Sequence, residues 1–169
     1  MRKRATTLTI LTVGSLAVAA VAWMTAPKAT AHCQIPCGIY GDETRFNLLM
    51  EHAVTIERSM VQIAALSKDP TKNANQIARW VSNKEAHADE VAEIVTQYFL
   101  QQRVKAPKAK SGEEYDAYVK KLVLCHGILV SAMKCKQTTD LSNVESLRKA
   151  TTDFKAAYIG KRAPAHSHR

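Results

Sequence analysis

The chain has 169 residues, with 24 Lys and Arg against 15 Asp and Glu, and a formal net charge of +9. This length suits one domain with a substantial core. The basic residues form no arginine-rich run and no pattern interleaved with aromatic residues, which argues against nucleic-acid binding. A moderate positive charge instead favours the attraction of small anions.

The first 31 residues have the pattern of an export signal. Arg2-Lys3-Arg4 is positive, Leu8 to Trp23 carries no charge, and Ala29-Thr30-Ala31 provides small residues for cleavage. An uncleaved membrane anchor is the alternative, but the apolar stretch is shorter than the roughly 20 residues that a membrane span needs. We therefore expect a signal peptidase or a dedicated processing peptidase to cut after Ala31. The exported protein, periplasmic or extracellular, then has 138 residues and a formal charge of +5.

Segment 32–40 is predicted to be a metal hook. Cleavage would free an α-amine on His32, and this amine, the Cys33 amide nitrogen and the Cys33 thiolate can form two fused five-membered chelate rings. Pro36 can turn the chain so that Cys37 supplies a fourth donor, while the His32 imidazole approaches from above. A plane of nitrogen and sulfur donors suits nickel(II) or copper(II), whereas zinc prefers tetrahedral sites.

A disulfide between Cys33 and Cys37 is the simpler alternative, because exported proteins meet oxidising conditions. It does not account for a histidine at the processing site, for the Pro-Cys-Gly turn or for Tyr40. The combined pattern therefore favours metal binding. The thiolates must then escape oxidation, which requires metal loading before export or loading coupled to processing.

Four segments with apolar residues at helical spacing follow the hook. They run from about Glu43 to Leu66, from about Lys72 to Gln102, from near Ser111 onward, and from a capping box at Ser142–Glu145 to Gly160. Short links favour antiparallel neighbours, and 103–110 is a longer, basic connection. The predicted fold is all-α: an up-and-down antiparallel four-helix bundle over 41–160, with the hook before it and a flexible tail, 161–169, after it.

The helical stripes predict which residues form the core. The predicted core residues are Phe46, Leu49, Met50, Ala53, Met60, Ile63, Ile77, Trp80, Val81, Ala88, Val91, Val95, Tyr98, Tyr115, Tyr118, Leu122, Cys125, Leu129, Ala132, Met133, Val144, Leu147, Phe154 and Tyr158. Cys125 and Cys135, ten residues apart on one helix, are predicted to be buried thiols. The single helical histidines His52, His87 and His126 are predicted to be surface or packing residues, and His166 and His168 belong to a solvated tail.

The motif His32-Cys33-x-x-Pro36-Cys37-Gly38-x-Tyr40 resembles the N-terminal motif of nickel-containing superoxide dismutases. More loosely, the resemblance extends through the helices and the Tyr98-Phe99 pair. It implies a nickel ion bound by His32, Cys33 and Cys37, and a homohexamer of four-helix bundles. The implied reaction converts superoxide to dioxygen and hydrogen peroxide by Ni(II)/Ni(III) cycling. By the same resemblance, Tyr40 is a catalytic residue that limits access to the metal and helps order small anions.

Two positions depart from the family pattern. Gln34 stands where the family often has an acidic residue, and the glutamate that orients the histidine ring falls on Leu48, near Asn47 and Glu51. Its arginine partner falls near Asn83 or Lys84.

A basic rim that guides superoxide is assigned to Arg45 and Lys84. Two other functions remain open on the residues. One is a noncatalytic exported nickel or copper carrier, and the other is a disulfide-stabilised helical interaction protein.

Overall fold

The computed structural model describes residues 41–160. Within them the chain forms α2 (Asp42–Leu66), α3 (Pro70–Glu93), which continues as the π-helical η1 (Ile94–Arg103), α4 (Glu113–Gln137) and α5 (Leu141–Ile159). No strand occurs in this part of the chain. The prediction of an all-α four-helix bundle is confirmed, while the expected leader, hook and tail lie outside the described residues.

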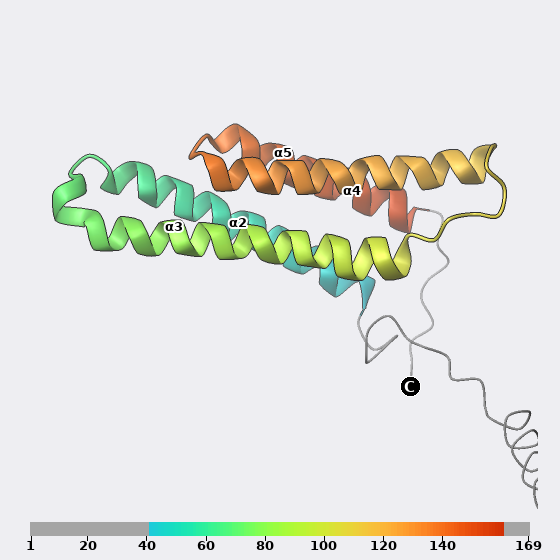
Figure 1. Cartoon of the computed structure of the whole chain (residues 1–169), viewed down its shortest axis with the longest axis horizontal. Coiled ribbons are helices and arrows are strands. Elements are labelled where there is room, and N and C mark those ends of the chain that lie inside the picture. The colour runs from blue at the N-terminus through green and yellow to red at the C-terminus, as the bar shows by residue number, and fades with distance from the viewer. Residues whose placement is uncertain (1–40, 161–169) are drawn as a thin grey trace, which may run out of the picture. The chain divides into compact units, whose positions relative to one another are not determined.

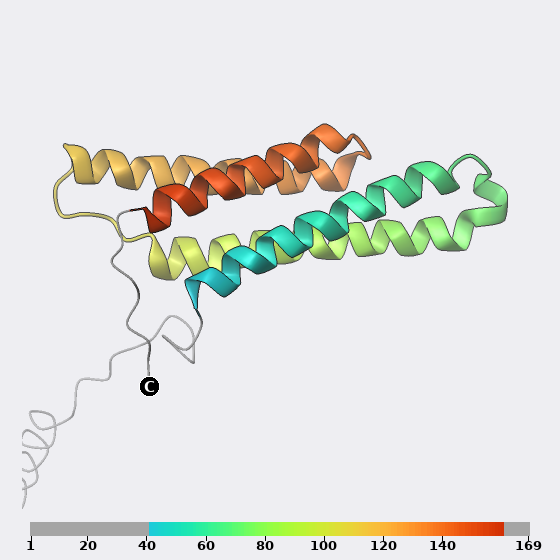
Figure 2. The ribbon, with the colours of Figure 1, turned by 180° about the vertical axis from the view of Figure 1, so that it is seen from behind.

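The bundle consists of two antiparallel hairpins, α2–α3 and α4–α5 (Figure 1). Helix α3 packs beside α4, and α2 packs beside α5. Seen from either side, the α2–α3 hairpin extends past the turn between α4 and α5 (Figures 1 and 2). The start of α2, the end of η1 and the end of α5 all lie at the opposite end of the bundle.

Capping side chains mark the starts of α3 and α5. Pro70 occupies the first turn of α3, and the Asp69 carboxylate accepts a hydrogen bond from the Lys72 amide at 3.3 Å. The expected capping box at Ser142–Glu145 is wrong: α5 begins at Leu141, and Asp140 Oδ1 accepts from the Ser142 amide at 3.0 Å. Asp and Ser cap helices about equally well, so the sequence does not rank these two positions.

The predicted second helix is confirmed in extent, but its last ten residues are π-helical. At its end the Val104 amide donates to the Phe99 carbonyl at 2.8 Å, a step of five residues. Four residues of this segment are buried: Ile94, Val95, Tyr98 and Phe99. A pattern search at ordinary helical spacing does not detect such a segment.

Aromatic side chains fill the core at the end where α2 begins. Phe46, Phe99 and Phe154 pack with ring centroids 4.8 to 5.5 Å apart, and Tyr158 contacts all three. Tilted and edge-on rings are favourable arrangements for such a cluster. The buried apolar residues are Phe46, Leu49, Ala53, Ile56, Met60, Ile63, Ala88, Val91, Ile94, Val95, Tyr98, Phe99, Val104, Cys125, Ile128, Ala132, Cys135, Val144, Leu147, Phe154 and Tyr158.

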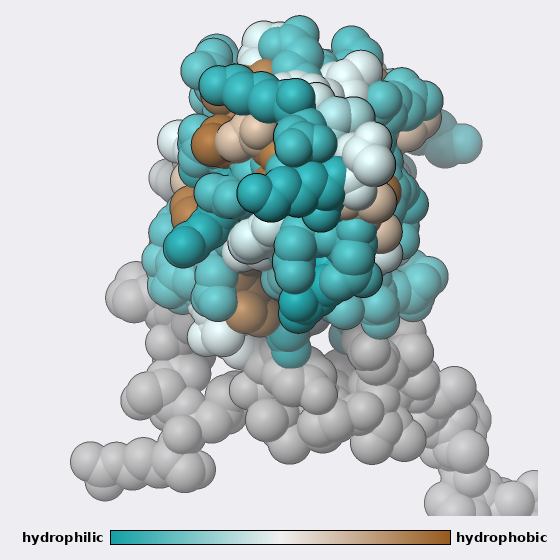
Figure 3. All heavy atoms as spheres, turned by 90° about the vertical axis from the view of Figure 1, so that its left-hand side faces the viewer, coloured by the Kyte–Doolittle hydropathy of each residue, from teal (hydrophilic) through white to brown (hydrophobic). Residues whose placement is uncertain are grey.

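Most of the predicted core is therefore confirmed, and the exceptions lie on α2, α3 and α4. Met50 on α2 and Tyr115, Tyr118, Leu122 and Leu129 on α4 are half-buried, and Met133 on α4 is exposed. The exceptions on α3 lie in its first half. Val81 is exposed, Ile77 and Trp80 are half-buried, and no residue of α3 before Lys84 is buried. This half of α3 belongs to the part of the hairpin that extends past the α4–α5 turn. Viewed from that end, the surface is mostly hydrophilic with isolated hydrophobic side chains (Figure 3). None of the helices in 41–160 is long and apolar enough to cross a membrane.

Candidate metal centre and its attachment to the bundle

The predicted ligands His32, Cys33 and Cys37, and the predicted catalytic Tyr40, lie outside the described residues. Their donor set is nonetheless chemically suited to nickel, because imidazole and thiolate are both ligands that this metal accepts. In the described part of the chain, no group of three or more His, Cys, Asp or Glu side chains is placed to hold a metal ion. The description begins at Gly41, the residue that follows Tyr40.

Asp42, the first residue of α2, is the centre of a cluster of polar side chains from three elements. We call Asp42, Tyr98, Arg103 and Tyr158 the Asp42 cluster. Tyr98 Oη donates to Asp42 Oδ1 at 2.7 Å, and Tyr158 Oη donates to Asp42 Oδ2 at 3.1 Å. Arg103 Nε lies 3.4 Å from Asp42 Oδ1, and Arg103 Nη2 donates to Tyr98 Oη at 3.1 Å. Both carboxylate oxygens of Asp42 are therefore used.

Burial and charge keep the Tyr98 phenol protonated. Burial raises its pKa, the hydrogen bond to Asp42 raises it further, and Arg103 acts in the opposite direction. The Arg103 and Arg45 guanidinium groups lie 5.0 and 5.4 Å from the Tyr98 ring centroid, within cation–π range. Two positive side chains therefore lie beside the start of α2.

A hollow of 380 Å³ lies between α2 and the α3–η1 helix, next to the Asp42 cluster. Its lining residues are Arg45, Leu48, His52, Glu90, Glu93, Ile94, Gln97 and Tyr98. The predicted rim residue Arg45 thus lines a hollow close to the attachment point of the hook, where two carboxylates oppose its charge. Leu48, the position that aligned with the family's glutamate, is apolar and half-buried here.

His52 and His87, which were expected to be single histidines, form a pair. Their Nδ1 atoms lie 2.8 Å apart, so one ring donates a proton and the other accepts it. Burial lowers the pKa of His52, the charge of His87 lowers it further, and Glu90 and Glu51 oppose the shift. The sequence could have predicted this pair. His52 and His87 are nearly the same number of residues from Asp69, which lies in the turn between two antiparallel helices.

Lys84 does not contribute to a basic rim, and this expectation is wrong. The residue is only 4% exposed, and its ammonium donates to the carbonyl oxygens of Cys135 at 2.8 Å, Thr138 at 3.3 Å and Lys136. The last carbonyls of a helix have no partner within the helix and carry partial negative charge, so a buried ammonium there is stabilising. Lys84 is a cap for α4.

The other positions considered for orienting the histidine ring also have different surroundings. Asn83 donates from Nδ2 to Ser59 Oγ at 2.9 Å, which joins α3 to α2. Asn47 and Glu51 are exposed on α2. Within 41–160, the positions Asn47, Glu51, Asn83 and Lys84 therefore do not form the glutamate–arginine pair that the family resemblance implies.

Cys125 and Cys135 are buried free thiols, as predicted. Burial raises the pKa of Cys125 to about 12 and that of Cys135 to about 11, although Lys84 lowers the latter. Both thiols are therefore protonated at neutral pH. Binding a metal would require the loss of the thiol proton, and burial makes that loss costly at both positions.

A four-helix bundle preceded by a His-Cys-x-x-Pro-Cys segment is the arrangement of a helical protein with candidate metal ligands ahead of its first bundle helix. The family model for nickel-containing superoxide dismutase matches residues 27–162, and the chain belongs to this family. Nickel is accordingly its cofactor. No curated protein and no solved structure gave a match.

Proposed function

We propose that the chain is an exported nickel superoxide dismutase that converts superoxide to dioxygen and hydrogen peroxide. The observation that carries this proposal is the family match, which spans the hook segment and the whole bundle in one continuous stretch, 27–162. When bound, nickel supplies one-electron chemistry by alternating between Ni(II) and Ni(III).

The hook residues have separate tasks in this proposal. His32 contributes its α-amine and imidazole, Cys33 its amide nitrogen and thiolate, and Cys37 a second thiolate. Tyr40 limits access to the centre, since a phenol ring excludes larger molecules while its hydroxyl can donate a hydrogen bond to a small anion.

The net positive charge of the processed chain, formally +5, supports the capture of an anionic substrate. Arg45 and Arg103 lie beside the start of α2, where Asp42, Glu90 and Glu93 oppose their charge. Superoxide is an anion, so the net positive charge raises its rate of arrival, and added salt should reduce that rate.

Export with cleavage after Ala31 is part of the proposal, because the α-amine of His32 exists only after processing. The leader pattern in residues 1–31 supports it. Mass determination of the protein purified from its native compartment tests it, and a start at any residue other than His32 contradicts it.

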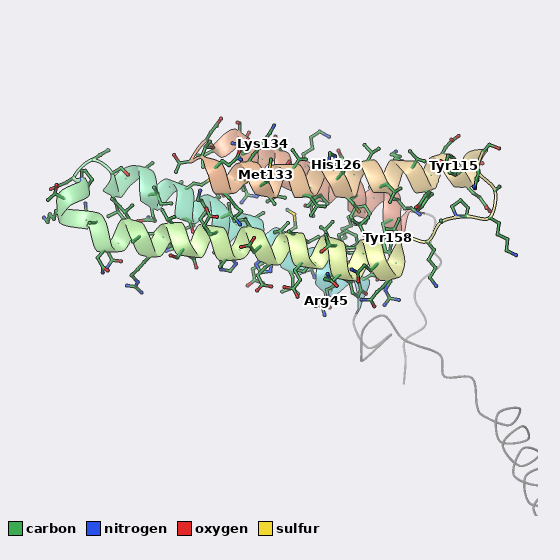
Figure 4. All side chains as sticks on the ribbon, in the orientation of Figure 1. Arg45, Tyr115, His126, Met133, Lys134 and Tyr158 are labelled. Carbon is green, nitrogen blue, oxygen red and sulfur yellow. The ribbon has the colours of Figure 1, made fainter. Side chains whose placement is uncertain are left out.

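A homohexamer is the proposed assembly, by resemblance to the family. An apolar stripe on the outer face of α4 supports self-association. Val119, Val123 and Met133, which are 36%, 64% and 48% exposed, share one side of this helix, and Figure 4 shows Met133 there along with His126 and Tyr115. Sedimentation of the nickel-loaded protein tests the assembly separately from the activity.

The activity is tested on protein that starts at His32 and is loaded with nickel, by following superoxide decay. Adding one residue before His32, or changing Cys33 or Cys37 to Ser, should abolish nickel binding and dismutation. Cys135→Ala is the matched control, since it removes a buried thiol and should retain both properties. Retained activity in the hook variants contradicts the proposal.

The same measurements separate the two alternatives. Nickel or copper bound at full occupancy without superoxide decay indicates a noncatalytic exported carrier. A disulfide-stabilised interaction protein should behave identically with and without metal.

A further inference from the structure

We propose that Asp42 is a positioning residue for the nickel hook, because its carboxylate clamps the chain two residues after Tyr40 to η1 and α5. This inference rests on the proposed function. It concerns a residue that neither the hook motif nor the family resemblance had singled out.

Because Asp42 is only two residues after Tyr40, its position restricts where the end of the hook can lie. An extended chain spans at most about 3.6 Å per residue, so the Cα of Tyr40 lies within about 7 Å of that of Asp42, and the Cα of Cys37 within about 18 Å. Gly41, which caps α2, accepts a hydrogen bond from the Arg45 amide at 3.3 Å. The position of Asp42 therefore limits the volume within which the hook residues can lie.

The Asp42 carboxylate is held in one position because its two donors, Tyr98 and Tyr158, are themselves fixed by packing in the core. Tyr98 and Tyr158 are 5% and 6% exposed, and each carries its hydroxyl group on a rigid ring. The Tyr98 ring packs edge-on against Phe99 at 5.1 Å, and the Tyr158 ring lies 5.4 Å from that of Phe99. A carboxylate whose two oxygens accept from two such phenols cannot shift without breaking a hydrogen bond to a charged group.

Helix capping does not explain this arrangement. Gly41 is the N-cap of α2, and no side chain caps this end. Glu43 also places a negative charge in the first turn, where it interacts favourably with the helix dipole. Its carboxylate, however, is exposed and pairs with Lys155. Asp42 instead faces inward, toward residues 56, 61 and 116 positions further along the chain.

The test compares Asp42→Asn and the milder Tyr158→Phe with Glu57→Gln. The Glu57 carboxylate accepts from Arg148 Nη2 at 2.6 Å, so it also joins α2 to α5, but it lies about 22 Å further along α2. Glu57→Gln therefore controls for the loss of a carboxylate contact between the same two helices. Unfolding in urea measures the general loss of stability in all three variants.

Two readouts report positioning. In the metal-free protein, hydrogen exchange of the Arg45 amide should accelerate by about tenfold in Asp42→Asn, because the first turn of α2 opens more often. In the nickel-loaded protein, the absorption and electron paramagnetic resonance spectra of the metal should change, and the superoxide decay rate should fall by about tenfold. Tyr158→Phe should change both in the same direction by less, and Glu57→Gln should change neither.

The outcomes distinguish the inference from the proposed function. Inactivity of the nickel-loaded wild-type protein overturns the function, whereas the exchange measurement on metal-free protein still reports on Asp42. If the wild-type protein is active and Asp42→Asn has the same exchange, spectra and decay rate as Glu57→Gln, Asp42 has no positioning role.

Discussion

His52 on α2 and His87 on α3 share a hydrogen bond between their Nδ1 atoms, which lie 2.8 Å apart. The two rings are half-buried and tilted by 49°, with centroids 5.1 Å apart. Only one of the two facing nitrogens can carry the shared proton, so protonating both rings fully breaks this contact. The pair therefore makes the α2–α3 hairpin sensitive to acid.

The first prediction concerns this sensitivity. The folded-state pKa of His52 is below its usual value of 6.5, so the unfolded chain binds a proton more readily than the folded chain does. The free energy of unfolding is then highest above pH 6.5 and falls as the pH drops through 6.5 toward the lower, folded-state pKa. Glu90 and Glu51 reduce the effect without reversing it.

Urea unfolding between about pH 8 and about pH 5 measures this dependence. His52→Asn should flatten the slope relative to the wild-type protein. His126→Asn, a change at an exposed position on α4, should leave the slope unchanged. Equal slopes for the wild-type protein and His52→Asn would contradict the assignment.

The second prediction concerns the cap on α4. Lys84→Met keeps a side chain of similar length but leaves three carbonyl oxygens without their ammonium donor, so the free energy of unfolding should fall by about 2 kcal/mol or more. Lys149→Met is the control, because the exposed Lys149 pair with Asp153 should contribute less than about 1 kcal/mol. Similar losses in both variants would show that Lys84 is not the cap.

The third prediction concerns thiol reactivity. A Cys33→Ser/Cys37→Ser double variant retains only Cys125 and Cys135, whose pKa values are raised to about 12 and about 11. Because only the thiolate attacks a disulfide reagent, neither should react rapidly at neutral pH while the bundle is folded. Both thiols should react with the reagent after denaturation. A rapid reaction of either thiol in the folded protein would contradict the prediction.

The fourth prediction compares two glycines. Gly112 precedes α4 with φ of +91°, a conformation that L side chains rarely adopt, and no atom within 4 Å would meet a Cβ there. Gly112→Ala should therefore cost about 1 to 2 kcal/mol through the backbone alone. In Gly127→Ala the new Cβ lies 3.9 Å from that of Ala150, an ordinary contact, and the helix should gain about 0.5 to 1 kcal/mol. Thermal unfolding of the two variants should show shifts of opposite sign.

The helical spacing of apolar residues, together with the residues that begin and end helices, is sufficient to predict the bundle. The break at Asp69-Pro70, the stop at Gly160 and the buried Phe46, Leu147 and Phe154 all follow from residues that are close in the sequence. The π-helical geometry of η1 could not be predicted in this way, because a search at the ordinary spacing of 3.6 residues per turn does not distinguish a π-helix from an α-helix.

In the candidate site, too, the part formed by residues close in the sequence could be predicted, whereas the part formed by distant residues could not. The hook motif is contiguous, so the sequence alone predicts its ligands His32, Cys33 and Cys37, and these assignments remain predictions. The Asp42 cluster joins residue 42 to residues 98, 103 and 158, and periodicity carries no information about such pairings. Lys84 illustrates the same limit, because its charge suggested a surface role and only the fold shows the three carbonyls around it.

Among the residues that the structure describes, the buried core runs from Phe46 to Tyr158, and its side chains pack against one another within the four helices. We therefore expect these contacts to persist when the ion is withdrawn, so that nickel can be added to a bundle that is already folded.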